Sequence, residues 1–140
     1  MKKILAYIAF SFTAITSYAT TPLWMRDVQI SPDGTEIVFC YKGDIYKVPT
    51  EGGAATQLTT QDSYECTPVW SPDGKQIAFA SDRNGNFDIF VMPANGGTAR
   101  RLTTHSTNEV PATFTPDGKY ILFSASIQGP AGSALFPSAA

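Results

Sequence analysis

The chain has 140 residues, of which 43% are hydrophobic and 16% charged, and its formal net charge is −2. This composition is typical of a folded globular protein and is too apolar for a disordered chain. The basic residues form no stripe along the sequence, which argues against nucleic acid as a partner.

The first 19 residues have the pattern of an export signal. Lys2 and Lys3 precede an apolar stretch over residues 4–15, and Ser17 and Ala19 provide the small residues of a cleavage site. The apolar stretch is too short to span a bilayer. The sequence therefore predicts a signal peptide over residues 1–19, a periplasmic or secreted protein, and no membrane span after cleavage.

A Ser/Thr-Pro-Asp-Gly motif occurs three times at a nearly constant spacing. It begins at Ser31, Ser71 and Thr115, so the intervals are 40 and 44 residues. Three further pairs of landmarks lie 44 residues apart: Asp44-Ile45 and Asp88-Ile89, Gly52-Gly53 and Gly96-Gly97, and Leu58-Thr59-Thr60 and Leu102-Thr103-Thr104. Self-similarity at such a period indicates a repeat architecture. The shorter first interval is explained by a tighter hairpin between Phe39 and Asp44 than between Phe79 and Asp88.

Within each period, apolar and polar residues alternate and turn residues interrupt the alternation, which is typical of strands and hairpins. In the Pro-Asp-Gly turns, proline presets φ at the first central position and glycine accepts a positive φ. Four short antiparallel strands in 40–44 residues form one propeller blade. The predicted strands are 26–30, 37–41, 45–48 and 56–59, then 66–70, 76–81, 87–92 and 99–103, and finally 110–114 and 120–125.

The predicted fold class is all-β, a partial β-propeller of four-stranded antiparallel blades after a signal peptide. Two blades are complete and one is incomplete: residues 20–126 hold blades 1, 2 and part of 3, and residues 127–140 are expected to be a loop-like truncated tail. Because a propeller closes with about four to eight blades, we expect the chain to be part of a longer protein. Blades bury their apolar faces only against neighbours, so we expect an isolated fragment to fold poorly.

Polar residues in two loops could be taken for functional sites. Asp82, Asn84, Asn86 and Asp88 alternate as calcium ligands do, but the segment lacks the glycine and the bidentate glutamate that an EF-hand loop needs at its sixth and twelfth positions. His105, the single histidine, is expected in a solvated loop between blades, because adjacency in a loop does not assemble a catalytic triad. We therefore assign no catalytic, cofactor-binding or metal-binding residue and no cofactor.

Several residues are expected to be structural. The recurrence of Asp33, Asp73 and Asp117 at one position of the repeat favours a role in the turn. Alternate strand positions must pack on the adjacent blade, which predicts an inter-blade core of aromatic side chains. Its members are Trp70, Phe79, Phe90 and Phe114. Trp24 has no partner in the other repeats and is the aromatic residue expected to be exposed.

The two cysteines, Cys40 and Cys66, lie in different repeats. An exported chain permits a disulfide between them. Two small buried apolar side chains are the other interpretation, and the required Cα separation cannot be obtained from sequence. Both alternatives stay open at this point.

The repeats resemble the Pro-Asp-Gly propeller repeats of TolB translocation proteins and of the tricorn-protease propeller. The resemblance rests on residues 68–79, 81–85, 88–92 and 101–103 and extends over nearly all of residues 24–126. TolB-like proteins usually carry an α/β domain before the propeller, and none fits between Thr20 and Trp24. Tricorn-like serine peptidases begin with the propeller and carry PDZ-like and peptidase domains downstream.

The resemblance implies that the chain is the N-terminal propeller fragment of an exported tricorn-like serine peptidase. It would act as a substrate-gating or interaction scaffold and be non-catalytic itself, whereas the parent protein could be an enzyme. Its partners would be a peptide or protein and the downstream domains of the same polypeptide. The alternative is a TolB-like periplasmic propeller that mediates protein–protein interaction, and a third hypothesis is a small-molecule sensor propeller of a surface receptor. The blade number stays open.

Overall fold

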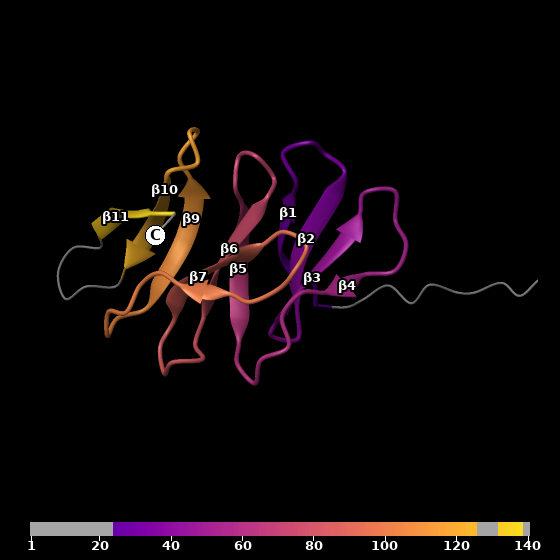
Figure 1. The fold of residues 1–140 in the computed structure, drawn as a ribbon. Helices are drawn as coiled ribbons and strands as arrows, with labels where there is room; N and C mark the ends of the chain where they lie inside the picture. Colours follow the sequence, from indigo (N-terminus) through magenta and orange to yellow (C-terminus); the bar gives the residue numbers. More distant parts are fainter. Residues whose placement is uncertain (1–23, 126–131, 139–140) are drawn as a thin grey trace, which may run out of the picture.

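Consecutive strands joined by tight turns build every sheet of this chain. The computed structural model describes residues 24–125 and 132–138. Three antiparallel sheets lie side by side in chain order (Figure 1). The first contains β1 (Arg26–Ile30), β2 (Glu36–Tyr41), β3 (Asp44–Pro49) and β4 (Thr56–Gln57); the second β5 (Glu65–Trp70), β6 (Gln76–Ser81), β7 (Asp88–Pro93) and β8 (Arg100–Arg101); the third β9 (Glu109–Phe114), β10 (Tyr120–Ala125) and β11 (Gly132–Pro137).

These three sheets are the expected blades, and the all-β fold class of a partial propeller is confirmed. Residues 42–43 join β2 to β3, whereas residues 82–87 join β6 to β7, so the shorter first repeat does have the tighter hairpin. Within residues 24–125 and 132–138, no helix has the length and apolar character needed to cross a membrane. The predicted signal peptide over residues 1–19 lies outside the described residues.

The third blade is longer than the sequence predicts. β11 (Gly132–Pro137) pairs antiparallel with β10, from Ala125 opposite Gly132 to Tyr120 opposite Pro137. The expectation of a loop-like tail over residues 127–140 is therefore wrong for these six residues. Without a further strand, the backbone N–H and C=O groups along the outer edge of β10 would lack partners. A following segment can form these hydrogen bonds even when its own apolar and polar residues alternate only weakly.

The Pro-Asp-Gly turns are held by a side-chain network. The Ser71 hydroxyl donates to Asp73 Oδ1 at 2.7 Å and accepts from the backbone N–H of Gln76 at 2.9 Å. Asp73 Oδ1 also accepts from the N–H of Lys75 at 3.1 Å, and Gly74 has a φ of 68°, which favours glycine. The same contacts recur at Ser31 and Asp33 and at Thr115 and Asp117. The structural role predicted for the three aspartates is confirmed.

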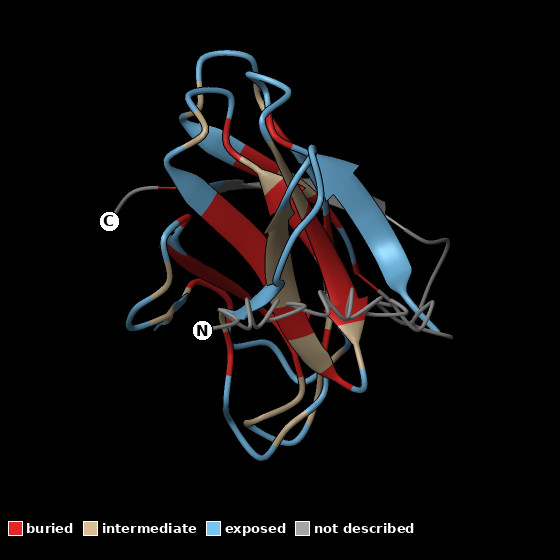
Figure 2. Cartoon of the chain, turned by 90° about the vertical axis from the view of Figure 1, so that its right-hand side faces the viewer, coloured by how far each residue is buried: buried red, intermediate tan, exposed pale blue. Residues whose placement is uncertain are grey.

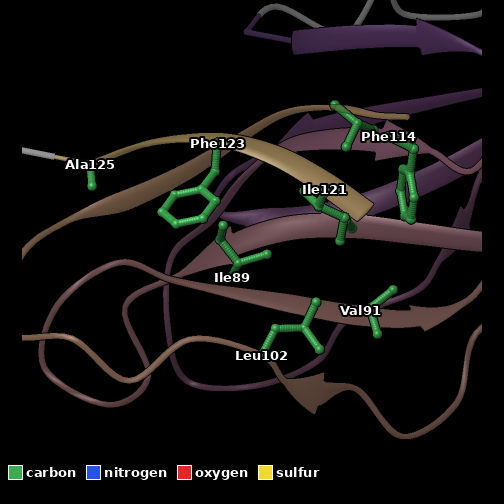
Figure 3. Packing of buried hydrophobic residues seen from close by; sticks show 9 residues of the cluster. Ile89, Val91, Leu102, Phe114, Ile121, Phe123 and Ala125 are labelled. Atoms are coloured by element: carbon green, nitrogen blue, oxygen red, sulfur yellow. The ribbon is translucent and has the colours of Figure 1, made fainter. Parts of the chain in front are cut away.

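Apolar side chains fill the spaces between blades. Along β6, Ile77 and Phe79 belong to the cluster shared with blade 1, whereas Ala78 belongs to the cluster shared with blade 3. Figure 3 shows the cluster between blades 2 and 3, in which Phe123 of β10 faces Ile89 of β7. Buried residues accordingly concentrate in the central strands, and turns are exposed (Figure 2).

The predicted aromatic core is confirmed. Phe79 is fully buried and stacks on Phe90 with ring centroids 5.9 Å apart. Phe114 is buried between blades 2 and 3, and Trp70 packs against the cluster between blades 1 and 2. Trp24 is 75% exposed, also as predicted.

We expect Phe79→Ala to lower the free energy of unfolding by about 3–5 kcal/mol, because loss of a fully buried ring leaves a cavity between two blades. Tyr120→Ala is the matched control: its ring is 43% exposed, and its loss should cost less than about 1 kcal/mol. Urea denaturation followed by circular dichroism measures both. Equal costs for the two variants would contradict the packing described here.

The turn aspartates also predict how stability responds to acid. Hydrogen bonds from the Ser31, Ser71 and Thr115 hydroxyls, followed by backbone N–H groups, lower the pKa of the carboxyls below the ordinary value of 3.8. A folded-state pKa below the unfolded value means that the ionised carboxylates stabilise the fold above pH 3.8. This contribution is lost as the pH falls through the folded-state values. The three carboxyls that contribute are those of Asp33, Asp73 and Asp117.

Replacing all three by asparagine should therefore flatten the decrease in thermal midpoint between pH 5 and about pH 3. Asp62→Asn, in an exposed loop, is the control and should leave the acid response unchanged. Thermal unfolding at a series of pH values measures the effect. An unaltered acid response in the triple variant would show that other carboxyls dominate it.

Candidate functional site

The loops that vary between blades gather at one end of the sheets. This end, called the hairpin end below, comprises residues 42–43 and 82–87 between the central strands and residues 58–64 and 102–108 between blades. Backbone hydrogen bonds join these loops: the N–H of Glu65 donates to the Gly43 carbonyl at 2.6 Å, and that of Glu109 donates to Phe87 at 2.7 Å. The Pro-Asp-Gly turns lie at the opposite ends of the same strands.

A buried ion pair lies at the hairpin end of blade 2. The Glu65 side chain is fully buried, and its Oε1 accepts from Ser81 Oγ at 2.9 Å and from Arg83 Nη2 at 3.0 Å. The guanidinium group of Arg83 lies 4.4 Å from the centroid of the Phe90 ring. Burial and the nearby Glu65 charge raise the pKa of Asp44. These contacts couple the ion pair to the inter-blade core.

A second buried ion pair joins β7 and β8 within blade 2. Asp88 is fully buried and accepts from Arg101 Nη2 at 2.6 Å. Burial raises the pKa of the Asp88 carboxyl, and the neighbouring Arg101 charge partly offsets this. Three carboxylate oxygens at this end, Glu65 Oε2, Asp88 Oδ1 and Glu109 Oε2, are buried without a hydrogen-bond partner among the described residues.

The residues that resemble a calcium loop hold backbone groups of neighbouring loops. Asp82 Oδ1 accepts from the N–H of Tyr64 at 2.8 Å. Asn86 Nδ2 donates to the carbonyls of His105 and Thr107 at 3.0 and 2.8 Å, and Asp88 binds Arg101. Among the described residues, no three His, Cys, Asp or Glu side chains are gathered as metal ligands would be.

His105 lies in the loop between blades 2 and 3. It is exposed, and its Nδ1 lies 3.1 Å from Thr107 Oγ1 and accepts from the Thr107 N–H at 3.3 Å. The hydrogen bonds of its imidazole ring are therefore local to one loop. The assignment of no catalytic residue to this chain stays a prediction.

Both cysteines are free. Cys40 is buried in the cluster between blades 1 and 2, and Cys66 packs against that cluster. Burial raises the pKa of the Cys40 thiol to about 12 and also raises that of Cys66. Of the two alternatives open in the sequence, the structure has the small buried side chains.

A pocket of about 330 Å³ opens at the hairpin end beside blade 1. We call it the aromatic pocket. Three separate segments line it: the start of β1, the β2–β3 hairpin and the loop before β5. Its lining residues are Trp24, Arg26, Cys40, Tyr41, Lys42, Gly43 and Tyr64. Only Trp24 was singled out from sequence. Arg26 meets the β2–β3 hairpin only once β1 pairs with β2, and Tyr64 joins them only when blade 2 stacks on blade 1.

A larger hollow of about 500 Å³, the inter-blade groove, lies between Leu58–Gln61 of blade 1 and Gly97–Ala99 of blade 2. Arg83 also lines it, but its guanidinium group is already bound to Glu65 and Ser81. The remaining polar groups of the lining are mostly threonine hydroxyls and backbone.

Two four-stranded sheets and a three-stranded one, stacked in chain order and each with a Pro-Asp-Gly turn, define a β-propeller of the TolB and tricorn type. The model of one family, the tricorn protease N-terminal beta propeller domain, matches residues 22–135, and the chain belongs to that family. The resemblance inferred from the repeats is thereby confirmed.

Individual relatives agree with this assignment. The uncharacterized peptidase YuxL of Bacillus subtilis (strain 168) is 32% identical over 96 residues, which cover 61% of this chain and 13% of that protein. A solved structure described as TolB from Agrobacterium tumefaciens superimposes with a TM-score of 0.75 and 26% identity over 85% of this chain and 47% of that one. The tricorn protease structure has the same fold, with a TM-score of 0.59 and 16% identity over 79% of this chain and 12% of that one.

We expect Arg83→Met to destabilise the fold by roughly 2–4 kcal/mol, because it leaves the Glu65 carboxylate buried without its cation. Lys75→Met, which removes an exposed pair with Asp73, should cost less than about 1 kcal/mol. The double variant Glu65→Leu/Arg83→Met should recover part of the loss, since no unpaired charge remains. Urea denaturation of the four proteins measures these costs, and a double variant worse than Arg83→Met would contradict this account of the pair.

Proposed function

We propose that this chain is the N-terminal propeller part of an exported tricorn-like serine peptidase, in which it gates substrate access or serves as an interaction scaffold without catalysing the reaction. The observation that carries this proposal is the match of the tricorn N-terminal propeller family over residues 22–135. The 32% identity to a bacterial peptidase supports it. The chain spans only 13% of that relative, so the activity of a whole protein is part of the proposal.

The geometry is compatible with a scaffold. The fully buried acidic side chains at the hairpin end are paired with arginines inside the structure: Glu65 with Arg83 and Asp88 with Arg101. Apolar clusters fix each blade against the next. A rigid stack of this kind can position a channel or a peptide-binding surface, while downstream PDZ-like and peptidase domains would supply the catalytic groups.

A TolB-like periplasmic propeller that binds a protein partner is the second candidate. The TM-score of 0.75 and the 26% identity to the Agrobacterium tumefaciens TolB structure favour it. The two candidates differ in one chemical property, since only the first requires a reactive serine in the protein that contains this chain.

A fluorophosphonate probe distinguishes these candidates. We expect the full protein, isolated from its native host, to be labelled at a serine outside residues 1–140, as located by mass spectrometry of proteolytic peptides. The purified 140-residue chain, treated in parallel, should not be labelled. A full protein that takes up no label while a serine peptidase control does would favour the TolB-like function, and label within residues 1–140 would contradict the non-catalytic role.

Export to the periplasm or beyond is part of the same proposal. It predicts that the mature protein begins at Thr20, directly after the small residues of the cleavage site. N-terminal sequencing of protein from the periplasmic or extracellular fraction measures this. Recovery in the cytoplasm with Met1 still present would contradict it.

A further inference from the structure

The aromatic pocket at the hairpin end has the composition of a recognition site. Two of its aromatic residues are exposed, to different extents: Trp24 is 75% exposed and Tyr64 is 41% exposed. Trp, Tyr and Arg are the side chains that most often dominate binding energy at protein interfaces. All three types line one hollow of about 330 Å³ here.

The exposed Tyr64 is held in position. Its backbone N–H donates to Asp82 Oδ1 at 2.8 Å, and its ring makes an edge-on contact with Phe87 at 6.3 Å between centroids. A Cβ added at Gly43 would lie 3.2 Å from the Tyr64 ring, so the glycine permits the ring to lie close against the hairpin. An exposed aromatic residue that is already ordered loses little conformational entropy when it binds a partner.

The pocket also offers positive charge that forms no ion pair within the described part of the chain, although Lys42 Nζ lies 5.4 Å from the centroid of the Tyr41 ring. Arg26 and Lys42 are exposed, and neither has a carboxylate within 4 Å among the described residues. Of the acidic groups nearest to them in the sequence, Asp27 accepts from the N–H of Thr67 at 3.0 Å, and Asp44 forms no ion pair with Lys42. The chain as a whole has a formal charge of −2, so two cations without an ion pair in its described part, beside aromatic rings, are a feature of this pocket and not of the overall charge.

We propose that the aromatic pocket binds an extended acidic peptide segment, with an apolar side chain of the peptide against Trp24 and Tyr64 and a neighbouring Asp or Glu carboxylate facing Arg26 and Lys42. This rests on the peptide- or protein-binding role proposed above and names the chemistry of the partner. A peptide fits better than a nucleic acid, because two cations are too few to follow a phosphate backbone. It fits better than an apolar ligand, which would leave both cations unused.

The test is titration of the full-length protein with three capped peptides that carry an uncharged dye, followed by fluorescence polarisation. The first is acetyl-AEFEAA-amide, the second is acetyl-AQFQAA-amide, and the third is acetyl-AQFQAA with a free C-terminal carboxylate. We expect the acidic peptide to bind at least about fivefold more tightly than the amidated glutamine peptide, with an advantage that shrinks at high salt.

Variants of the pocket give the second comparison. Trp24→Ala should weaken binding of the acidic peptide by about tenfold or more, whereas Tyr120→Ala, another exposed aromatic, should not. Arg26→Gln with Lys42→Asn should remove the preference for the acidic peptide, and asparagine accepts the φ of 54° at position 42. Lys119→Gln, in the third blade, is the charge control. Unchanged thermal midpoints would establish that all variants are folded.

Three outcomes would overturn the inference: equal affinity for the acidic and glutamine peptides, tight binding of the glutamine peptide only when its C-terminal carboxylate is free, or binding that survives the pocket variants. Loss of binding in folded pocket variants, with both controls unaffected, supports it. Because peptide binding is read without any hydrolysis, its failure is distinguishable from failure of the serine-labelling experiment.

Discussion

The structure depends on one constraint: each blade has two apolar faces, and only a neighbouring blade can cover them. β6 illustrates this, because Phe79 and Ala78 are adjacent in sequence and belong to different inter-blade clusters. A strand that is buried on both faces gains stability only when blades stand on both sides of it. Phe79 is therefore fully buried in the middle blade, whereas Val28 and Ile30 at the start of blade 1 are more than half exposed.

The polar contacts at the two ends of the strands differ in kind. In each Pro-Asp-Gly turn, the side-chain hydrogen bonds join residues only a few positions apart, as between Ser71 and Asp73. The same turn can therefore form in every repeat whatever the next blade contains. At the hairpin end, Thr67 donates to Asp27 of the preceding blade and Asn86 donates to the carbonyl of Thr107. Stacking of the blades is thus fixed by apolar clusters along the strands and by directional contacts such as these. Hydrogen bonds also join blades near the Pro-Asp-Gly end, from Lys47 Nζ to Asn95 Oδ1 at 3.2 Å and from Arg100 Nη2 to the Ser138 carbonyl at 3.0 Å.

This difference explains what the sequence could predict. The turns and central strands are local, so the three motifs and the alternation around Ile77 and Phe79 were enough to predict two full blades. β11 depends on pairing with β10, and its own residues carry little strand pattern, so it was missed. Of the aromatic pocket, the sequence analysis singled out Trp24 alone. Tyr64 lies 40 residues later, at the equivalent position of the next repeat, and this signal was missed. Tyr64 and Lys42 lie far apart in sequence, and no local pattern brings them together.

The unequal hairpins connect the repeat to the pocket. In blade 2, the longer hairpin over residues 82–87 contains Arg83, whose guanidinium group packs on the Phe90 ring and pairs with Glu65. These contacts fill the space beside that hairpin. In blade 1, residues 42–43 make the turn alone, and Tyr64 of the following loop lies against Gly43. The short hairpin therefore leaves open the space beside Trp24 that the longer one fills in the next blade. A four-residue difference between otherwise equivalent repeats thus leaves the aromatic pocket open in blade 1, where the proposed peptide would bind.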